Sequence, residues 1–379
     1  MALSFQYRYN RLCVELRIVT FSYTTLWWGW DEWEQMLDWM ALHGLNLPLS
    51  WLGYEKILQQ VFVSIGLTED EILSFFSDPA FLAWNRFGNI KGSWANQTIT
   101  QDWVDQEFFL SKQIVQRMVD LGMTPVLPAF TGFVPDAITR VQPKATVVRG
   151  SEWNGFGTTF SNDTFLEPFD PLFSALQAKF INIQKEVYGN VSNVYTLDQY
   201  NENVPFSGDT DYLRNISRET MASLRNADPG AVWLMQGWLF FDQESFWSTD
   251  RIEAYLGGVE DPSEMIVLDL FSEVAPQWNR TQSYYGKRWI WCLLHGTSPH
   301  CCSYLDYGGN LGLEGNLGDL TTQPLFALEN TVSMAGVGLS MEGQEGNEAC
   351  PLKTKLMRSC IISYCSKHGR THRLTQHNM

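Results

Sequence analysis

Eight short apolar segments recur along the chain and constrain its fold more than any other feature. They alternate with segments of helical periodicity, and they lie at residues 14–22, 45–51, 124–130, 193–199, 232–236, 265–270, 289–294 and 334–339. Strands that are apolar along almost their whole length are typical of parallel sheets covered by helices on both faces. Eight such units predict an α/β fold, a (β/α)8 TIM-type barrel, whose functional site lies at the carboxyl ends of the strands.

The segments between the predicted strands carry helical signals. Residues 31–43 place apolar side chains such as Trp33 and Leu37 at helical spacing, and Gly44 ends the pattern. Similar patterns predict helices at residues 55–65, 69–76, 104–121, 171–188, 212–226 and 244–256. The polar stretch around Trp153 is expected to be a loop.

Two segments do not fit this alternation. Residues 295–307 interrupt the transition from the seventh strand to its loop, and residues 349–379 are basic, rich in cysteine and without an apolar period. Either could be an interaction tail, but both differ in composition from the acidic remainder, and we interpret them as misread or alternatively spliced sequence. We therefore expect a catalytic barrel domain over residues 1–348, with an aberrant insert at 295–307, and an irregular tail at 349–379 outside the fold.

The charge balance excludes one large class of partner. The 379 residues include 42 acidic and 26 basic side chains, which gives a formal net charge of −16. Because nucleic-acid binding relies on clustered Lys and Arg, we expect no nucleic-acid partner. The aromatic content of 14%, with 16 Trp, instead favours a cleft that stacks flat apolar faces, such as those of sugar rings.

Signals for cellular location point in two directions. No stretch approaches the roughly 18 consecutive apolar residues of a membrane span, and the N-terminus lacks the apolar run of a signal peptide. Taken literally, such a chain stays in the cytosol. Acceptor sequences for N-glycosylation nevertheless occur at Asn96, Asn162, Asn190, Asn215 and Asn279. They favour a secretory protein whose start is missing.

The seven cysteines show no metal-ligand spacing. A zinc cluster of Cys301 and Cys302 with His295 and His300 would combine adjacent cysteines with a histidine pair outside a helix, which is not typical of zinc sites. We therefore expect no bound metal.

Two glutamates that follow predicted strands are the candidates for catalysis. Glu202 ends a Tyr-Asn-Glu segment after the fourth strand, and Glu342 lies in a Met-Glu-Gly segment after the last. Burial and mutual repulsion can separate the pKa values of two carboxyl groups, so that one donates a proton while the other attacks an anomeric carbon. Asn201 could hold a sugar's 2-substituent. The alternatives are a solvated loop carboxylate at Glu202 and a helix-initiating glutamate at Glu342, with Glu345 and Glu348 as competitors.

Several aromatic side chains end predicted strands or lie in the loops that follow them. They are Tyr23, Trp27, Trp28, Trp84, Trp153, Trp238 and Trp291. Each one alone is more typical of a core than of a sugar platform, but Trp84, Trp153 and Trp238 are better candidates because they neighbour Gly or polar residues. Asp269 and His295 also end strands. His295 could bind a hydroxyl group or hold a carboxylate, or it could be an ordinary histidine at the barrel mouth.

The chain resembles glycoside hydrolase family 89, the lysosomal α-N-acetylglucosaminidases, over most of its length. The resemblance rests on long strings that occur in order, among them Ser-Tyr-Thr-Thr-Leu-Trp-Trp at residues 22–28 and Trp-Met-Ala-Leu-His-Gly-Leu-Asn-Leu-Pro-Leu at 39–49. The other strings lie at residues 79–84, 122–130, 231–240, 267–271 and 289–295. Shared strings of this length are highly specific.

The resemblance implies a retaining hydrolase that removes terminal α-linked N-acetylglucosamine, as in heparan sulfate breakdown, in the lysosome and without a metal or organic cofactor. Matched residue by residue, it makes Glu202 the general acid/base and Glu342 the nucleophile. The substrate-binding residues that it implies are Asn201, Tyr23, Trp84, Trp153, Trp238 and His295.

Departures from the family leave alternatives open. Residues 17–20 read Arg-Ile-Val-Thr where the family usually has Asn-Val-Cys-Thr, so we expect one polar contact to the sugar to be lost. We also expect the family's small N-terminal domain and its helical C-terminal domain to be missing. The alternatives are a catalytically inactive carbohydrate-binding remnant and a retaining glycosidase of other sugar specificity. The expected partner is a glycan that ends in α-linked N-acetylglucosamine, and a homo-oligomer is left open.

Overall fold

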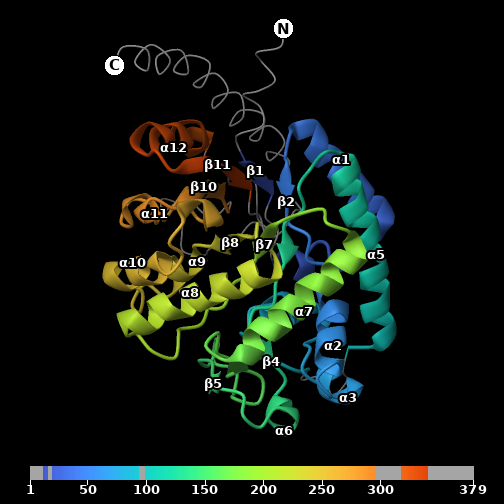
Figure 1. The fold of residues 1–379 in the computed structure, drawn as a ribbon. Helices are drawn as coiled ribbons and strands as arrows, with labels where there is room; N and C mark the ends of the chain where they lie inside the picture. Colours follow the sequence, from blue (N-terminus) through green and yellow to red (C-terminus); the bar gives the residue numbers. More distant parts are fainter. Residues whose placement is uncertain (1–11, 16–18, 94–98, 295–316, 340–379) are drawn as a thin grey trace.

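The computed structural model describes residues 12–15, 19–93, 99–294 and 317–339, and its centre is a ring of eight parallel strands (Figure 1). The strands are β1 (Leu12–Glu15), β2 (Leu47–Pro48), β3 (Leu127–Pro128), β7 (Val194–Thr196), β8 (Val232–Gln236), β9 (Met265–Asp269), β10 (Arg288–Leu293) and β11 (Met334–Leu339). Hydrogen-bonded neighbours follow the order β2-β1-β11-β10-β9-β8-β7-β3. The predicted (β/α)8 barrel is confirmed.

The two ends of this sheet meet and close the barrel. Leu49, just after β2, pairs in parallel with Val126, just before β3. The Val126 amide donates to the Pro48 carbonyl oxygen at 2.8 Å, and the Ser50 amide donates to the Val126 carbonyl oxygen at 2.9 Å. Closure brings the carboxyl ends of all eight strands to one rim, where sites on this fold lie.

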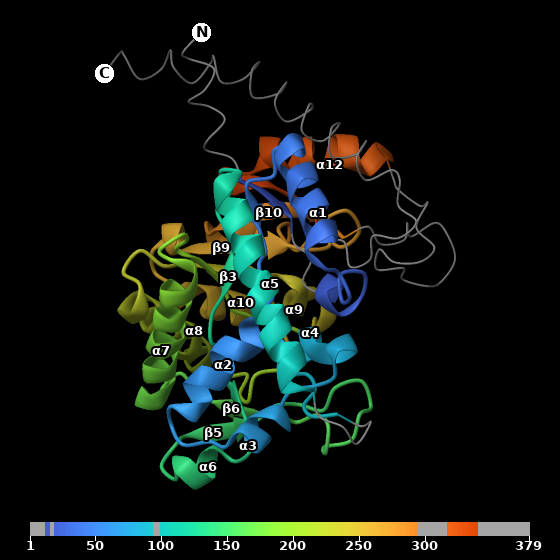
Figure 2. The ribbon, with the colours of Figure 1, turned by 90° about the vertical axis from the view of Figure 1, so that its right-hand side faces the viewer.

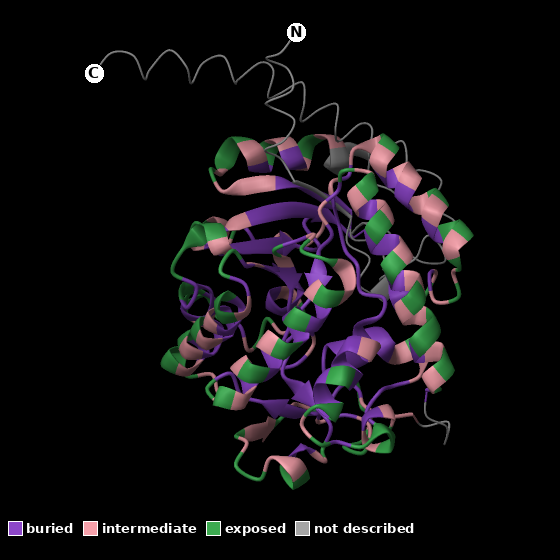
Figure 3. Cartoon of the chain, turned by 45° about the vertical axis from the view of Figure 1, so that its right-hand side comes forward, coloured by how far each residue is buried: buried purple, intermediate pink, exposed green. Residues whose placement is uncertain are grey.

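Helices surround the barrel, with buried faces inward and exposed faces outward (Figure 3). They are α1 (Trp30–His43), α2 (Tyr54–Val63), α3 (Glu69–Leu73), α4 (Leu82–Arg86), α5 (Gln101–Asp120), α6 (Ile138–Val141), α7 (Pro171–Tyr188), α8 (Thr210–Ala227), α9 (Trp238–Asp242), α10 (Thr249–Gly257), α11 (Gln282–Tyr285) and α12 (Leu317–Asn330). Figure 2 shows α1 and α5 packed side by side on one face. None of the helices in the described ranges is both long enough and apolar enough to cross a membrane.

Helix α1 shows how the sequence signals produce a helix. The Gly29 amide donates to the Glu32 carboxylate at 3.0 Å, which satisfies one of the free N–H groups at the start. Gly44 ends the helix in the left-handed region at φ 75°. Trp33 and Leu37 lie on the buried face, as their spacing predicts.

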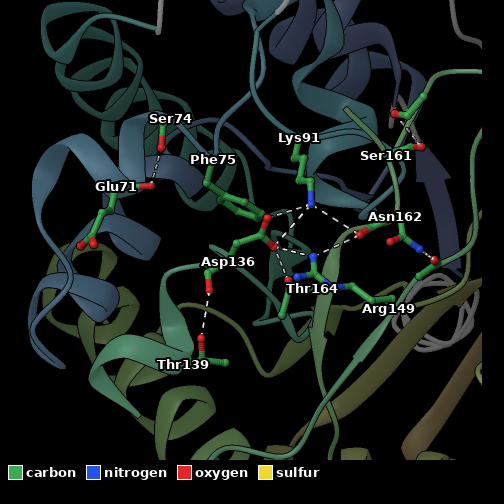
Figure 4. A network of polar contacts seen from close by, with 12 residues as sticks. Glu71, Ser74, Phe75, Lys91, Asp136, Thr139, Arg149, Ser161, Asn162 and Thr164 are labelled. Carbon is green, nitrogen blue, oxygen red and sulfur yellow. Dashed lines mark hydrogen bonds and ion pairs between the residues drawn. The ribbon is translucent and has the colours of Figure 1, made fainter. Parts of the chain in front are cut away.

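A small antiparallel sheet beside the barrel was not predicted. It has the order β4-β6-β5 and consists of β4 (Phe133–Val134), β5 (Val147–Arg149) and β6 (Thr164–Leu166). Figure 4 shows the Asp136 carboxylate binding Lys91 at 3.1 Å, Arg149 at 2.6 Å and the hydroxyl group of Thr164. These contacts fix both ends of the loop that runs from β5 to β6 and contains Trp153.

Two further expectations require correction. Residues 14–22 do not form one strand, because β1 ends at Glu15 and Val19–Ser22 is a 3₁₀ helix. The helix expected at 244–256 begins only at Thr249, because a turn precedes it. In this turn the Trp247 amide donates a hydrogen bond to the Gln243 carbonyl oxygen at 3.0 Å, and the Trp247 side chain is fully buried. Helix α12 was not predicted. The insert at 295–307 and the tail at 349–379 lie outside the described residues.

Candidate active site

The loop after β7 carries Glu202 and is held against the end of β8. Asp198 accepts hydrogen bonds from the backbone amide of Gln236 at 2.8 Å and from its side-chain amide at 3.0 Å. Burial raises the pKa of the Asp198 carboxyl group to about 6. Tyr200 then packs its ring against Phe165 and Tyr255, with centroids 5.9 and 6.1 Å away. These contacts anchor the loop on both sides.

Glu202 lies between two indole rings at the barrel rim. Its Oε2 accepts from the Trp153 Nε1 at 2.6 Å, and its Oε1 accepts from the Trp238 Nε1 at 3.2 Å. Burial raises the pKa of the Glu202 carboxyl group above its usual range; the Trp153 bond opposes this rise, and the negative charge of Asp242 adds to it. A half-buried carboxyl group of this kind can hold a proton and donate it.

The other predicted aromatic residues form a row that leads to Glu202. Tyr23 meets Trp84 edge-on with ring centroids 5.5 Å apart, and Trp84 lies 5.8 Å from Trp153. Trp153 also stacks on Phe156 at 5.5 Å. Tyr23 is 48% exposed, whereas Trp153 is 6% exposed, so the row descends from the surface to the carboxyl group. Such a row offers flat apolar faces for sugar rings.

Helix α4, which carries Trp84, is fixed by a buried ion pair. Arg86 donates from Nε and Nη2 to the two carboxylate oxygens of Glu55, at 2.7 and 2.9 Å. The two side chains are only 5% and 2% exposed. Ser22 adds a second anchor, because its hydroxyl oxygen accepts from the Ala83 amide at 3.0 Å. The position of Trp84 is therefore set by the barrel body.

The remaining predicted residues divide into three groups. Asn201 is 5% exposed beside Glu202, and its Oδ1 has no hydrogen-bond partner within the described part of the chain. Trp291 is 1% exposed and belongs to the core, while Trp27 is 75% exposed. Glu342 and His295 lie outside the described residues.

Asp242 is a site residue that the sequence did not suggest. It ends α9, four positions after Trp238, so both side chains project from one face of the helix toward the region of Glu202. In the sequence, Asp242 is marked only by its position four residues after Trp238. That spacing indicates a site residue only when Trp238 is known to bind Glu202. Among the described residues, no group of three His, Cys, Asp or Glu side chains is placed to hold a metal ion.

A half-buried carboxyl group set among aromatic rings at the carboxyl rim of a (β/α)8 barrel is the arrangement of barrel-type glycoside hydrolases. The chain belongs, within this class, to the family of the alpha-N-acetylglucosaminidase (NAGLU) TIM-barrel domain, whose family model matches residues 14–351. A curated relative, the alpha-N-acetylglucosaminidase of Homo sapiens, is 39% identical over 340 residues, which are 89% of this chain and 44% of the relative.

Two solved structures from Clostridium perfringens share the fold. One is CpGH89 in complex with its substrate GlcNAc-alpha-1,4-galactose, with 28% identity and a TM-score of 0.78 over 92% of this chain and 37% of the other. The second is a family 89 glycoside hydrolase in complex with PUGNAc, with 29% identity and a TM-score of 0.79 over 94% and 39% of the two chains. The chain thus spans less than half the length of these relatives.

Proposed function

We propose that this barrel removes terminal α-linked N-acetylglucosamine from glycans such as heparan sulfate, with Glu202 as general acid/base and Glu342 as nucleophile. The observation that carries the proposal is the Glu202 carboxyl group, which two indole N–H groups orient and whose pKa burial raises above its usual range. The human relative's name and the substrate bound to CpGH89 support the choice of N-acetylglucosamine. A lysosomal location is proposed on the same relationship.

The chemistry is a double displacement. Glu202 gives its proton to the glycosidic oxygen while Glu342 attacks the anomeric carbon, so that the leaving sugar departs as an alcohol and a glycosyl ester forms on Glu342. The Glu202 carboxylate then takes a proton from water, whose oxygen attacks the anomeric carbon and releases Glu342. Two inversions give net retention.

The aromatic row supplies the sugar's apolar contacts in this proposal. The ring centroids of Trp84 and Trp153 lie 5.8 Å apart. Asn201 presents a buried amide whose Oδ1 has no partner among the described residues and can accept a bond from an N-acetyl N–H group. A buried polar atom without a partner is costly, so a ligand that satisfies it gains affinity.

The test is to follow hydrolysis of an α-N-acetylglucosaminide by proton NMR and to identify the first anomer released. The α-anomer is expected, and the β-anomer would contradict retention. Sugar binding without turnover would contradict the proposed activity and favour a carbohydrate-binding protein. Inhibition by glucose as strong as that by N-acetylglucosamine would contradict the proposed sugar specificity.

A further inference from the structure

Asn203, directly after Glu202, joins the segment that carries Glu202 to the two segments that carry Trp84 and Trp153. Its Nδ2 donates to the Gly88 carbonyl oxygen at 3.1 Å and to the Phe87 carbonyl oxygen at 3.4 Å. Its Oδ1 accepts from the Ser151 hydroxyl group at 3.1 Å. The side chain is 2% exposed, so these bonds form away from solvent and are costly to break.

One side of this junction reaches Trp84. The backbone after α4 turns back on that helix, because the amide of Phe87 bonds to the Trp84 carbonyl oxygen at 3.2 Å. Gly88 continues the turn at φ 70°, and a Cβ there would lie 2.1 Å from the ring of Phe133. The two carbonyl oxygens that Asn203 binds are therefore held at a fixed distance from Trp84.

The other side of the junction reaches Trp153. Ser151 lies two positions before Trp153, and its hydroxyl oxygen also accepts from the Val204 amide at 3.4 Å. Ser151 is thus hydrogen-bonded both to the side chain of Asn203 and to the backbone amide of Val204. The loop that brings the Trp153 indole to Glu202 is tied to the Glu202 loop at this point.

We propose that Asn203 is a positioning residue, which holds the Trp153 indole on the Glu202 carboxyl group and aligns both with Trp84. It acts through these neighbours and touches no reacting atom. The inference rests on the proposed role of Glu202 as the acid/base. Asn203 is suited to this role because a neutral amide donates to one segment and accepts from another, which neither a carboxylate nor an ammonium group can do.

The primary test does not depend on activity. In ¹⁵N-labelled protein the indole N–H signal of Trp153, assigned by its loss in Trp153→Phe, is followed against pH. In the wild type it shifts as Glu202 ionises, because the two groups are hydrogen-bonded. Asn203→Ala is expected to reduce this shift and raise its midpoint, since the Trp153 bond holds the pKa of Glu202 down. The same titration curve in Asn203→Ala and wild type would overturn the proposal.

Activity provides the second readout through a double-mutant cycle. Asn203→Ala is expected to lower kcat/KM by about 10- to 100-fold, in keeping with misplacement of catalytic groups by about 1 Å. In the Trp153→Phe background its effect is expected to be several-fold smaller, because the two residues act on one bond. Equal effects in both backgrounds would overturn the proposal.

Controls separate the inference from folding and from the proposed function. Asn226→Ala removes an exposed asparagine that binds Ser174 on the outer helices, and it is expected to change neither readout. If Asn203→Ala does not fold, Ser151→Ala removes the hydroxyl group that bonds the Asn203 side chain and the Val204 amide, and it is expected to shift the titration in the same direction. An unchanged curve then overturns the proposal. If the wild-type protein does not hydrolyse the substrate, the proposed function is contradicted. The NMR titration would still test the role of Asn203.

Discussion

Glu202 and Asp269 both lie at the carboxyl ends of barrel strands, but their hydrogen-bond partners differ and indicate different roles. Asp269 ends β9, is 1% exposed, and accepts from the backbone amides of Gln277 at 3.1 Å and Trp278 at 3.0 Å. Among the described residues, the Glu202 carboxyl group accepts hydrogen bonds from the side-chain indoles of Trp153 and Trp238. A carboxylate that accepts from backbone amides holds the loop in place. A carboxyl group that accepts from side chains is oriented by them and does not hold the backbone. The type of donor therefore distinguishes the candidate acid from the structural carboxylate.

The largest expected effect comes from Glu202→Gln. It keeps the shape of the side chain and removes the transferable proton, so kcat/KM is expected to fall by about 10²- to 10⁴-fold. The free energy of unfolding is expected to fall by less than for Asp269→Ala, because only one of the two indole N–H groups loses its acceptor and no backbone group loses its partner. Steady-state kinetics and urea unfolding test the two statements, and a large loss of stability would place Glu202 in the same class as Asp269.

Asp269→Ala is expected to show the reverse pattern. It leaves two buried backbone N–H groups without acceptors, at about 1–3 kcal/mol each, so the free energy of unfolding should fall by about 2–5 kcal/mol at pH 7. The fraction of protein that remains folded should retain the pH optimum of the wild type. Unchanged stability in urea titrations would remove the distinction between the two carboxyl groups.

The electrostatic partners of Glu202 should act in opposite directions. Trp153→Phe removes a donor that stabilises the carboxylate, so the pKa of Glu202 should rise and the basic limb of the kcat/KM profile should move to higher pH. Asp242→Asn removes a negative charge that favours the protonated form, so the limb should move to lower pH. Movement of both variants in one direction would contradict the assignment of this limb to Glu202.

The smallest effect concerns Asp163, a buried carboxyl group in the β4–β6–β5 layer. It is 0% exposed, neither oxygen has a hydrogen-bond partner among the described residues, and burial raises its pKa well above the usual value. The folded state therefore holds a proton that the unfolded chain releases above about pH 4. This contribution to stability is complete below that pH and is lost as pH rises through the folded pKa. Asp163→Asn should flatten the decline of the melting temperature as the pH rises above about 4, and parallel curves would contradict this account.

The barrel could be predicted because its strands are apolar over almost their whole length, and this pattern needs no knowledge of contacts. The small sheet could not, because strands of two or three residues such as Phe133–Val134 are too short to show a period. For the site, the position of Trp238 after Gly237 made it a better candidate than Trp291. Both are buried in the structure, and Trp238 donates a hydrogen bond to Glu202. Asp242 and Asn203 were missed because their roles depend on which loops meet. The predicted roles of Glu342 and His295 remain predictions.

The central claim, that Glu202 is the acid/base of a retaining reaction, is tested most directly by Glu202→Ala with azide. The substrate is an α-N-acetylglucosaminide with a dinitrophenolate leaving group, which needs no proton to depart. The account predicts that azide enters the space left by the carboxyl group, accelerates turnover and yields the α-glycosyl azide. A variant that turns over at the wild-type rate without azide, or that yields the β-azide, would contradict the account.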